Sequence, residues 1–466
     1  MRIPNAWTAG LVLACVAAVG ASSDASPRAI SGAAAERSGD SPPTQIGRTH
    51  PYFLRKVREI LTPPEEGTAP VQEELVAELV ALGPESIPTL LAFLTGEAML
   101  LQADQPAEMG WAGRHGGTRQ DIVILDALRL FPAKRVLLEV QREVGEEADY
   151  GVRMVAMRVL ARVAGPGAFD VWEHTVSGIE PLLLMRVQQD SPIRDALEFI
   201  LESDRSAYRD LKDAVPALHP PLWPQIAEAV GGVGGEAGLD VLARLAGRSA
   251  EADAAVLEQV GAIAERLYSS SPQGCYSWVR PMLRAEDPRT RSRAIDTLVD
   301  LGDADSIHDF VEMLEDPSRR VQAAARQALE ELSGRRLGTN RDAWGEWYRR
   351  ERQWLETDAV TLRQKIDSRD PAEVVAAVGA LCQRKVFREE MVEVLAGALW
   401  RDEAEVVAAT CLALGQLGSK RAAPYLLDAL RDSEDLVRDS AWQALKLLTN
   451  EDLPSDYEVW ARRLRS

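Results

Sequence analysis

The stretch DPRTRSRAIDTLVDLGDADSIHDFVEMLEDPSRRVQAAARQALEELSG, residues 287–334, decides the fold because a similar stretch follows it later in the chain. A shift of 116 residues places it, without a gap, on EAEVVAATCLALGQLGSKRAAPYLLDALRDSEDLVRDSAWQALKLLTN, residues 403–450. Apolar residues recur at three- and four-residue spacings in both copies, and a Leu-Gly pair (301–302 and 417–418) interrupts each. This pattern predicts two helices joined by a short turn.

A shorter echo fixes the size of the repeating unit. AEVVAA occurs at 372–377 and again at 404–409, and five more stretches have helical spacing: 71–83, 87–94, 121–131, 133–144 and 152–165. Convincing alternating strands are absent from the sequence. Helical pairs with a period of roughly 30 to 40 residues indicate an α-solenoid, in which stacking on neighbours supplies the core that one pair lacks. We therefore predict an all-α fold.

The repeats resemble HEAT repeats, strongly from about 285 to 450, moderately from 71 to 175 and weakly from 176 to 280. The HEAT pattern D-x-x-x-x-V-R-x-x-A is present in DSEDLVRDSA, with Asp432, Val437 and Arg438, whereas Gln322 replaces the arginine in DPSRRVQAAA. The resemblance implies a solenoid of HEAT-like hairpins and leaves the role open, since such arrays serve many roles. Asp287 and Asp316, which precede first helices, are expected to cap backbone N–H groups.

Three tryptophans stand close together in GTNRDAWGEWYRRERQW, residues 338–354. Trp344, Trp347 and Trp354 can share one side of a helix from about 341 to 355. The segment is similar to T-G-x-x-F/L-G-x-D-x-x-x-W-x-x-W, which closes repeat blocks in secreted bacterial HEAT proteins, although Ser333 and Asn340 depart from it. In the second copy Trp460 matches Trp344, while Pro454 and Arg463 stand where the first copy has Gly338 and Trp347. Because the feature follows a hairpin twice, we interpret these four tryptophans as a structural closing element.

The same segment carries four arginines in a chain whose net charge is −19. Arg349, Arg350 and Arg352 are predicted to lie mostly away from the tryptophans. They are our candidates for binding an acidic partner, and the alternative is that they pair with acidic neighbours in the array. The overall acidity argues against a nucleic-acid partner.

A second candidate contact region is the irregular stretch from Gly96 to Gln120. It carries Trp111, Arg114 and His115 among glycines. Long loops in compact arrays are often functional. The alternative is a surface loop whose Trp111 packs on a neighbouring hairpin.

The N-terminal segment 1–25 resembles a secretory signal peptide, with cleavage expected near Val19-Gly20-Ala21 or Ser23-Asp24-Ala25. Lipidation at Cys15 is the alternative to plain cleavage, and the apolar run is too short for a transmembrane span. The composition of 26–49 predicts a disordered linker. Two repeat blocks are predicted to follow, at 50–355 and 356–466, each with a closing helix.

Groups suited to catalysis or metal binding are scarce in the sequence. None of the five histidines stands in a metal-ligand spacing, so no metal and no cofactor are predicted. We interpret Glu173-His174 as a surface pair, and Gly231–Gly235 as a flexible turn between helices. Cys275, Cys382 and Cys411 do not form a disulfide framework, although one pair could bridge after export.

These observations predict an exported, non-catalytic scaffold that presents an extended solenoid surface to a protein partner, in a bacterial periplasm or at the cell surface. The alternative is an enzyme accessory or modifying protein whose groove holds a small molecule or polysaccharide. A cleft that joins His115 or His174 to carboxylates would favour the alternative. The partner's identity, the oligomeric state and the number of repeats between 176 and 280 are left open.

Overall fold

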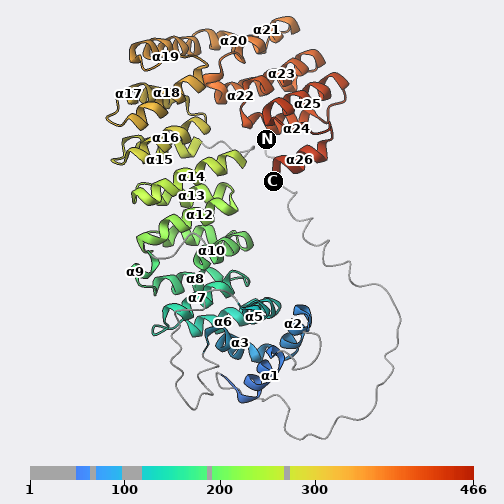
Figure 1. Ribbon diagram of the computed structural model, residues 1–466. Coiled ribbons are helices and arrows are strands. Elements are labelled where there is room, and N and C mark those ends of the chain that lie inside the picture. Colours follow the sequence, from blue (N-terminus) through green and yellow to red (C-terminus); the bar gives the residue numbers. More distant parts are fainter. Residues whose placement is uncertain (1–48, 63–69, 97–117, 186–190, 267–272, 466) are drawn as a thin grey trace, which may run out of the picture. The chain divides into compact units, whose positions relative to one another are not determined.

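Helical hairpins follow one another along the computed structural model, which describes residues 49–62, 70–96, 118–185, 191–266 and 273–465 (Figure 1). Within these residues the regular structure is helical throughout, which confirms the predicted all-α fold. The signal peptide, Cys15 and nearly all of the linker predicted at 26–49 lie outside the described residues, as do Trp111, Arg114 and His115.

The hairpins up to residue 333 form two rows of helices, and most helices pack against the next helix in their row. The first row consists of α2 (Gln72–Ala81), α5 (Arg119–Leu130), α7 (Tyr150–Leu160), α10 (Pro192–Ser203), α12 (Trp223–Val233), α14 (Ala250–Arg266), α16 (Pro288–Asp300) and α18 (Arg319–Ser333). The second row consists of α3 (Ile87–Thr95), α6 (Ala133–Glu143), α8 (Ala168–Ser177), α11 (Ala207–Ala214), α13 (Glu236–Leu245), α15 (Gln273–Val279) and α17 (Ile307–Met313). Helix α1 (Pro51–Leu61) packs on α2 and α3, and the short α9 (Pro181–Leu184) follows α8. Stacking of this kind is what an α-solenoid requires.

The chain continues through α19 (Arg341–Glu356) and α20 (Asp358–Ile366) into a second set of hairpins. This set consists of α21 (Pro371–Leu381), α22 (Arg388–Ala396), α23 (Ala404–Leu417), α24 (Ala423–Ala429), α25 (Asp435–Thr449) and α26 (Tyr457–Arg465). Short 3-10 turns enter many second helices or extend them, among them η4 (Arg280–Arg284), η5 (Ala304–Ser306), η6 (Lys385–Phe387), η7 (Gly397–Trp400) and η8 (Lys420–Ala422). The boundary predicted between residues 355 and 356 falls at the end of α19, inside the compact unit Gly47–Ser466.

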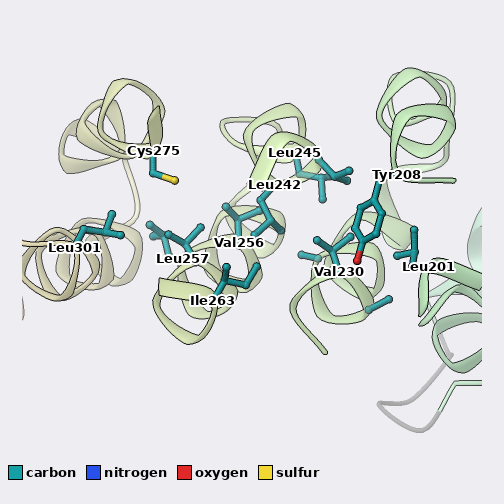
Figure 2. Close-up of a cluster of buried hydrophobic side chains, with 14 of the residues drawn as sticks. Leu201, Tyr208, Val230, Leu242, Leu245, Val256, Leu257, Ile263, Cys275 and Leu301 are labelled. Carbon is teal, nitrogen blue, oxygen red and sulfur yellow. The ribbon is translucent and has the colours of Figure 1, made fainter. Parts of the chain in front are cut away.

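The core is a continuous cluster of Leu, Val, Ile and Ala side chains that runs from hairpin to hairpin. It includes residues from 193–263 and 275–283, most of the stretch in which the sequence resembles HEAT repeats only weakly. Figure 2 shows this part, with Leu242, Val256 and Leu257 on neighbouring helices. The hairpins α10–α11, α12–α13 and α14–α15 therefore fill the stretch whose repeat number the sequence left open.

The arginine of the HEAT pattern ties α25 to the loop before it. Arg438 Nη1 donates hydrogen bonds to the carbonyl oxygens of Asp432 (2.7 Å) and Ser433 (2.8 Å). Gln322, which replaces that arginine, donates from Nε2 to the Asp316 carbonyl oxygen at 2.7 Å. Gln322 therefore makes a hydrogen bond equivalent to that of Arg438 with Asp432. The position still ties the helix to the preceding loop although the residue differs from the HEAT pattern.

The two predicted capping aspartates both accept a backbone N–H. Asp287 is the N-cap of α16 and accepts from the Arg289 amide at 3.2 Å. Asp316 accepts from the Ser318 amide at 2.8 Å and also binds the Arg291 guanidinium of α16 at 2.9 and 3.0 Å. Burial opposes ionisation of the Asp316 carboxyl, but its bonds to Arg291 and to the Ser318 amide lower its pKa overall.

The prediction that Gly231–Gly235 forms a turn is wrong for its first two glycines. Gly231 and Gly232 belong to α12, and only Gly234 and Gly235 have the positive φ of the turn, 76° and 93°. A Cβ at Gly231 would lie 2.0 Å from the Gln259 side chain of α14, and one at Gly232 would lie 2.4 Å from Glu198 of α10. Close packing against both neighbours therefore outweighs the low helix propensity of glycine here.

Candidate interaction surface

Helix α19 runs in the opposite direction to the helices of the second row. Two ion pairs show that α17 runs in the same direction as α15 and its extension η4. Arg280 binds Asp303, and Arg284, which comes later in η4, binds Asp309, which comes later in the partner segment. Helix α19 runs opposite to α17. Arg341, at the start of α19, binds Glu315 just after the end of α17, whereas Tyr348, further along α19, donates from Oη to the carbonyl oxygen of Ala304 before the start of α17, at 3.0 Å. The segment 334–340 therefore returns along α18 before α19 begins.

The tryptophans of α19 differ in their environments. Trp344 is 0% exposed, and its indole N–H donates to the Gly338 carbonyl oxygen at 2.8 Å. Trp347 is also buried, edge-on to Trp344 with ring centroids 5.6 Å apart. Trp354 is only half-buried, and the Arg384 guanidinium lies 5.1 Å above its ring.

Helix α26 repeats this arrangement at the end of the second set of hairpins. Trp460 is 0% exposed and donates its indole N–H to the Pro454 carbonyl oxygen at 2.8 Å. The Arg431 guanidinium lies 4.3 Å above the Tyr457 ring, so the start of α26 lies beside the residues that follow α24. By the 116-residue shift, Arg431 matches Glu315 and Tyr457 matches Arg341. The same position therefore holds an ion pair in the first copy and a cation–π pair in the second.

The three arginines predicted to bind a partner do not act as one group. Arg352 binds Asp305, which precedes α17, at 3.2 Å and Glu356 at 3.8 Å. Arg350 pairs with Glu346 of its own helix at 3.3 Å, and Arg349 is exposed with a 3.4 Å bond to the Gly345 carbonyl oxygen. For Arg352 and Arg350 the structure thus shows pairing with acidic neighbours.

Trp400 is the most exposed large apolar side chain among the described residues, at 81% of its surface. It ends η7, one residue before Arg401, which binds the Ile366 and Ser368 carbonyl oxygens at 3.3 and 2.9 Å and Glu403 at 3.1 Å. The backbone that carries Trp400 is therefore fixed while its indole faces solvent. Sequence reasoning missed it, although one signal was present: by the 116-residue shift Trp400 stands where the first copy has the exposed Arg284.

The exposed Trp400 has the features of a binding residue. Tryptophan, tyrosine and arginine are enriched among the few residues that contribute most to protein–protein binding. Half-buried Tyr425 lies on α24, the second α-helix after Trp400 along the chain, and the exposed Arg431 follows α24. We define Trp400, Tyr425 and Arg431 as the candidate interaction surface.

The other groups considered for chemistry have structural environments. His174 is exposed on α8, and its Nε2 lies 3.1 Å from the Val144 carbonyl oxygen. Cys275, Cys382 and Cys411 are buried free thiols, and burial raises the pKa of Cys275 to about 11 and that of Cys411 to about 12. Within the part of the chain that the structure describes, no three His, Cys, Asp or Glu side chains are grouped to hold a metal ion.

None of the helices in the described ranges is by itself long and apolar enough to cross a membrane. Among the described residues, one pair of helices, Gln72–Ala81 and Pro84–Thr95, reaches that length and apolar composition when the two are taken together, and the pair is bent by 98°.

Comparison with known proteins identifies the repeats. The HEAT repeats family matches residues 240–330 and 359–446. No curated protein matches the sequence. Together with the stacked hairpins, the family match shows that the fold is an α-solenoid of HEAT-like hairpins.

Three solved structures are similar to the chain at low identity. Human deoxyhypusine hydroxylase is 18% identical over 68% of this chain and 98% of its own, with a TM-score of 0.25. The karyopherin Kap121p, bound to the C-terminus of the phosphatase Cdc14p, is 12% identical over 89% of this chain and 47% of its own, with a TM-score of 0.36. The complex of CpcE and CpcF of the Nostoc phycocyanin lyase is 16% identical over 58% of this chain and 94% of its own, with a TM-score of 0.25.

Proposed function

We propose, from the HEAT repeats at residues 240–330 and 359–446, that the chain is a non-catalytic scaffold that binds another protein through its solenoid surface. The observation that carries this proposal is Trp400, 81% exposed on a backbone fixed by Arg401. Burying an indole of this kind against a partner releases a large apolar area from water. Leaving it in solvent contributes nothing to the stability of the fold.

The second part of the proposal concerns the location of the protein. The N-terminal segment 1–25 resembles a secretory signal peptide, and the motif around Trp344 resembles one found in secreted bacterial HEAT proteins. We therefore place the scaffold in a bacterial envelope, as a periplasmic, cell-surface or secreted protein. N-terminal sequencing and mass measurement of the mature chain test this: a new N-terminus near Ala21 or Ala25 indicates cleavage, and a lipid-modified Cys15 indicates anchoring.

The scaffold is tested by capture from the native envelope with three forms of the full chain. Wild type is compared with Trp400→Ala and with Leu130→Ala, a control that truncates a 63% exposed side chain on the distant helix α5. We expect one protein to be retained by wild type and Leu130→Ala and to be lost, by about 30-fold or more in affinity, with Trp400→Ala. Equal retention by all three forms would contradict the assignment of Trp400. Consumption of a small molecule or polysaccharide by the purified chain would contradict the non-catalytic assignment.

A further inference from the structure

The hairpins after α20 return to contact the hairpins before it. Arg388, at the start of α22, donates from Nη2 to the Val299 carbonyl oxygen of α16 at 3.1 Å, across 89 residues of sequence. A Cβ at Gly302 would lie 2.8 Å from Glu389 of α22, so the backbone at the α16–α17 turn meets this helix closely. Figure 1 shows α22 beside α18 after the chain has passed through α19, α20 and α21.

A single residue joins the two helices at which the chain changes direction. Thr357 ends α19 and also precedes the first residue of α20, with φ −117° and ψ −69°. Its amide and its hydroxyl both donate to the Gln353 carbonyl oxygen, at 3.0 and 2.7 Å. Hinges in proteins are often such positions at the ends of helices, where one or two residues absorb a change in φ and ψ.

The second joint, between α20 and α21, is held from outside. Arg401 binds the carbonyl oxygens of Ile366 and Ser368 there, while its guanidinium also binds Glu403. Helix α20 also packs directly against α21. Helix α19 also packs against α20, so the bonds from Arg401 to the backbone are what the joint between α20 and α21 has in addition.

Across the Thr357 joint, a charged contact links the two sets of hairpins. Arg384, which precedes η6, donates from Nη1 to both carboxylate oxygens of Glu351 on α19, each at 2.8 Å. Its guanidinium also covers the half-buried Trp354 ring of α19. The Glu351 side chain is only 7% exposed, so this carboxylate depends on Arg384 for its charge compensation. We call Glu351, Trp354 and Arg384 the clamp.

Packing inside the second set of hairpins is apolar and close. Gly415 of α23 lies so close to α25 that a Cβ there would be 2.7 Å from the Ala444 Cα, and Cys411, Leu414 and Leu445 are all buried. These contacts do not involve the Glu351 charge. The Glu351–Arg384 pair is lost when either partner is removed, whereas salt screens a partly buried pair of this kind only weakly.

We propose that the clamp is a latch: it holds the hairpins from α20 onward against α16–α18, and these hairpins swing as one arm about Thr357 when it breaks. The arm carries Trp400, so its position sets where the candidate interaction surface lies. The inference concerns the array itself and does not rest on the proposed function. Its test needs no partner.

The test uses the full chain and two matched variants. Glu351→Gln removes the charge that Arg384 binds, and Glu330→Gln removes the charge from the Arg326–Glu330 pair, which lies within α18 at 3.0 Å and does not cross the joint. Small-angle X-ray scattering reports the radius of gyration, and hydrogen exchange reports the opening of single segments.

The latch predicts a local effect. Glu351→Gln should raise the radius of gyration and speed amide exchange on the order of tenfold at 299–306 and 384–390, while 404–417 stays as protected as in wild type. Glu330→Gln should match wild type. Two results would overturn the proposal: an unchanged radius of gyration and unchanged exchange in Glu351→Gln, or loss of protection spread evenly over all helices.

Discussion

Trp344 and Trp460 make the same hydrogen bond, in which each indole N–H donates at 2.8 Å to the carbonyl oxygen six residues earlier, that of Gly338 and of Pro454. The acceptor residues differ completely in type, but a proline keeps its carbonyl group and so accepts equally well. The second copy therefore retains the contact despite its departure from the motif. Both indoles are fully buried, so each bond is made where an unpaired N–H would be costly.

We expect Trp344→Ala to lower the free energy of unfolding by about 3 to 5 kcal/mol, since it empties a buried indole site. Trp344→Phe keeps most of the apolar contact and loses the bond to Gly338, so it should cost about 1 to 2 kcal/mol. Urea denaturation followed by circular dichroism measures both. Trp400→Ala is the control, and its cost should stay within about 0.5 kcal/mol because that side chain is exposed. Equal costs for Trp344→Ala and Trp400→Ala would show that the α19 indole is not a core residue.

The repeats could be predicted from the sequence where the residues that form the hairpins are the same in the two copies. The 116-residue echo consists largely of core positions such as Val321 and Val437, both buried. In the stretch with weak resemblance the same tasks are done by other residues: Ser191 caps α10 through a 3.2 Å bond from the Ile193 amide. The hairpins remain while the motif fades, because caps and apolar stripes can be built from several residue types.

The interaction surface was harder to predict because it depends on which side chains the fold leaves exposed. Trp400 ends an apolar run, GALW, whose Ala398 is buried, so spacing alone does not separate the two. The partner of Arg352 was also out of reach, because Asp305 is 47 residues away and meets it only when α19 runs opposite to α17. Periodicity gives the face of a helix and carries no information on its direction in the stack.

The arginine of the HEAT pattern should be replaceable by glutamine and not by leucine. At Arg438 we expect Arg438→Gln to change the free energy of unfolding by less than about 0.5 kcal/mol, because Gln322 makes the equivalent bond. Arg438→Leu leaves the Asp432 carbonyl oxygen without this donor and should cost about 1 to 2 kcal/mol. Denaturant titration of the two variants is the measurement. If both variants lose the same amount, the contribution comes from the charge of Arg438 and its bond to Asp435.

Glu198 should destabilise the array at neutral pH. Partial burial beside Gly232 raises the pKa of its carboxyl, Glu202 and Asp195 raise it further by repulsion, and Arg194 opposes them. A carboxyl whose pKa is higher in the folded than in the unfolded state binds protons more tightly when folded, so stability rises as pH falls toward the ordinary value of about 4.3. Glu198→Gln should therefore raise the melting temperature at pH 7, and the gain should shrink toward about pH 4. The exposed Glu78→Gln serves as control; a gain that is constant with pH would exclude the titration of Glu198 as its cause.

Two glycines in first helices should respond in opposite ways to alanine, because only one of them is a contact point. Gly415 faces α25 so closely that its new Cβ would lie 2.7 Å from the Ala444 Cα and 3.0 Å from the Ala444 carbonyl oxygen, both backbone atoms that cannot rotate away. Gly415→Ala must therefore push α23 and α25 apart, at a cost of about 1 to 3 kcal/mol. Gly379 lies inside α21 with nothing within 4 Å of its Cβ position, so Gly379→Ala should stabilise the chain by roughly 0.5 to 1 kcal/mol through helix propensity alone. Thermal and denaturant unfolding of the two variants checks both signs, and stabilisation by Gly415→Ala would mean that α23 and α25 are further apart in solution than this packing requires.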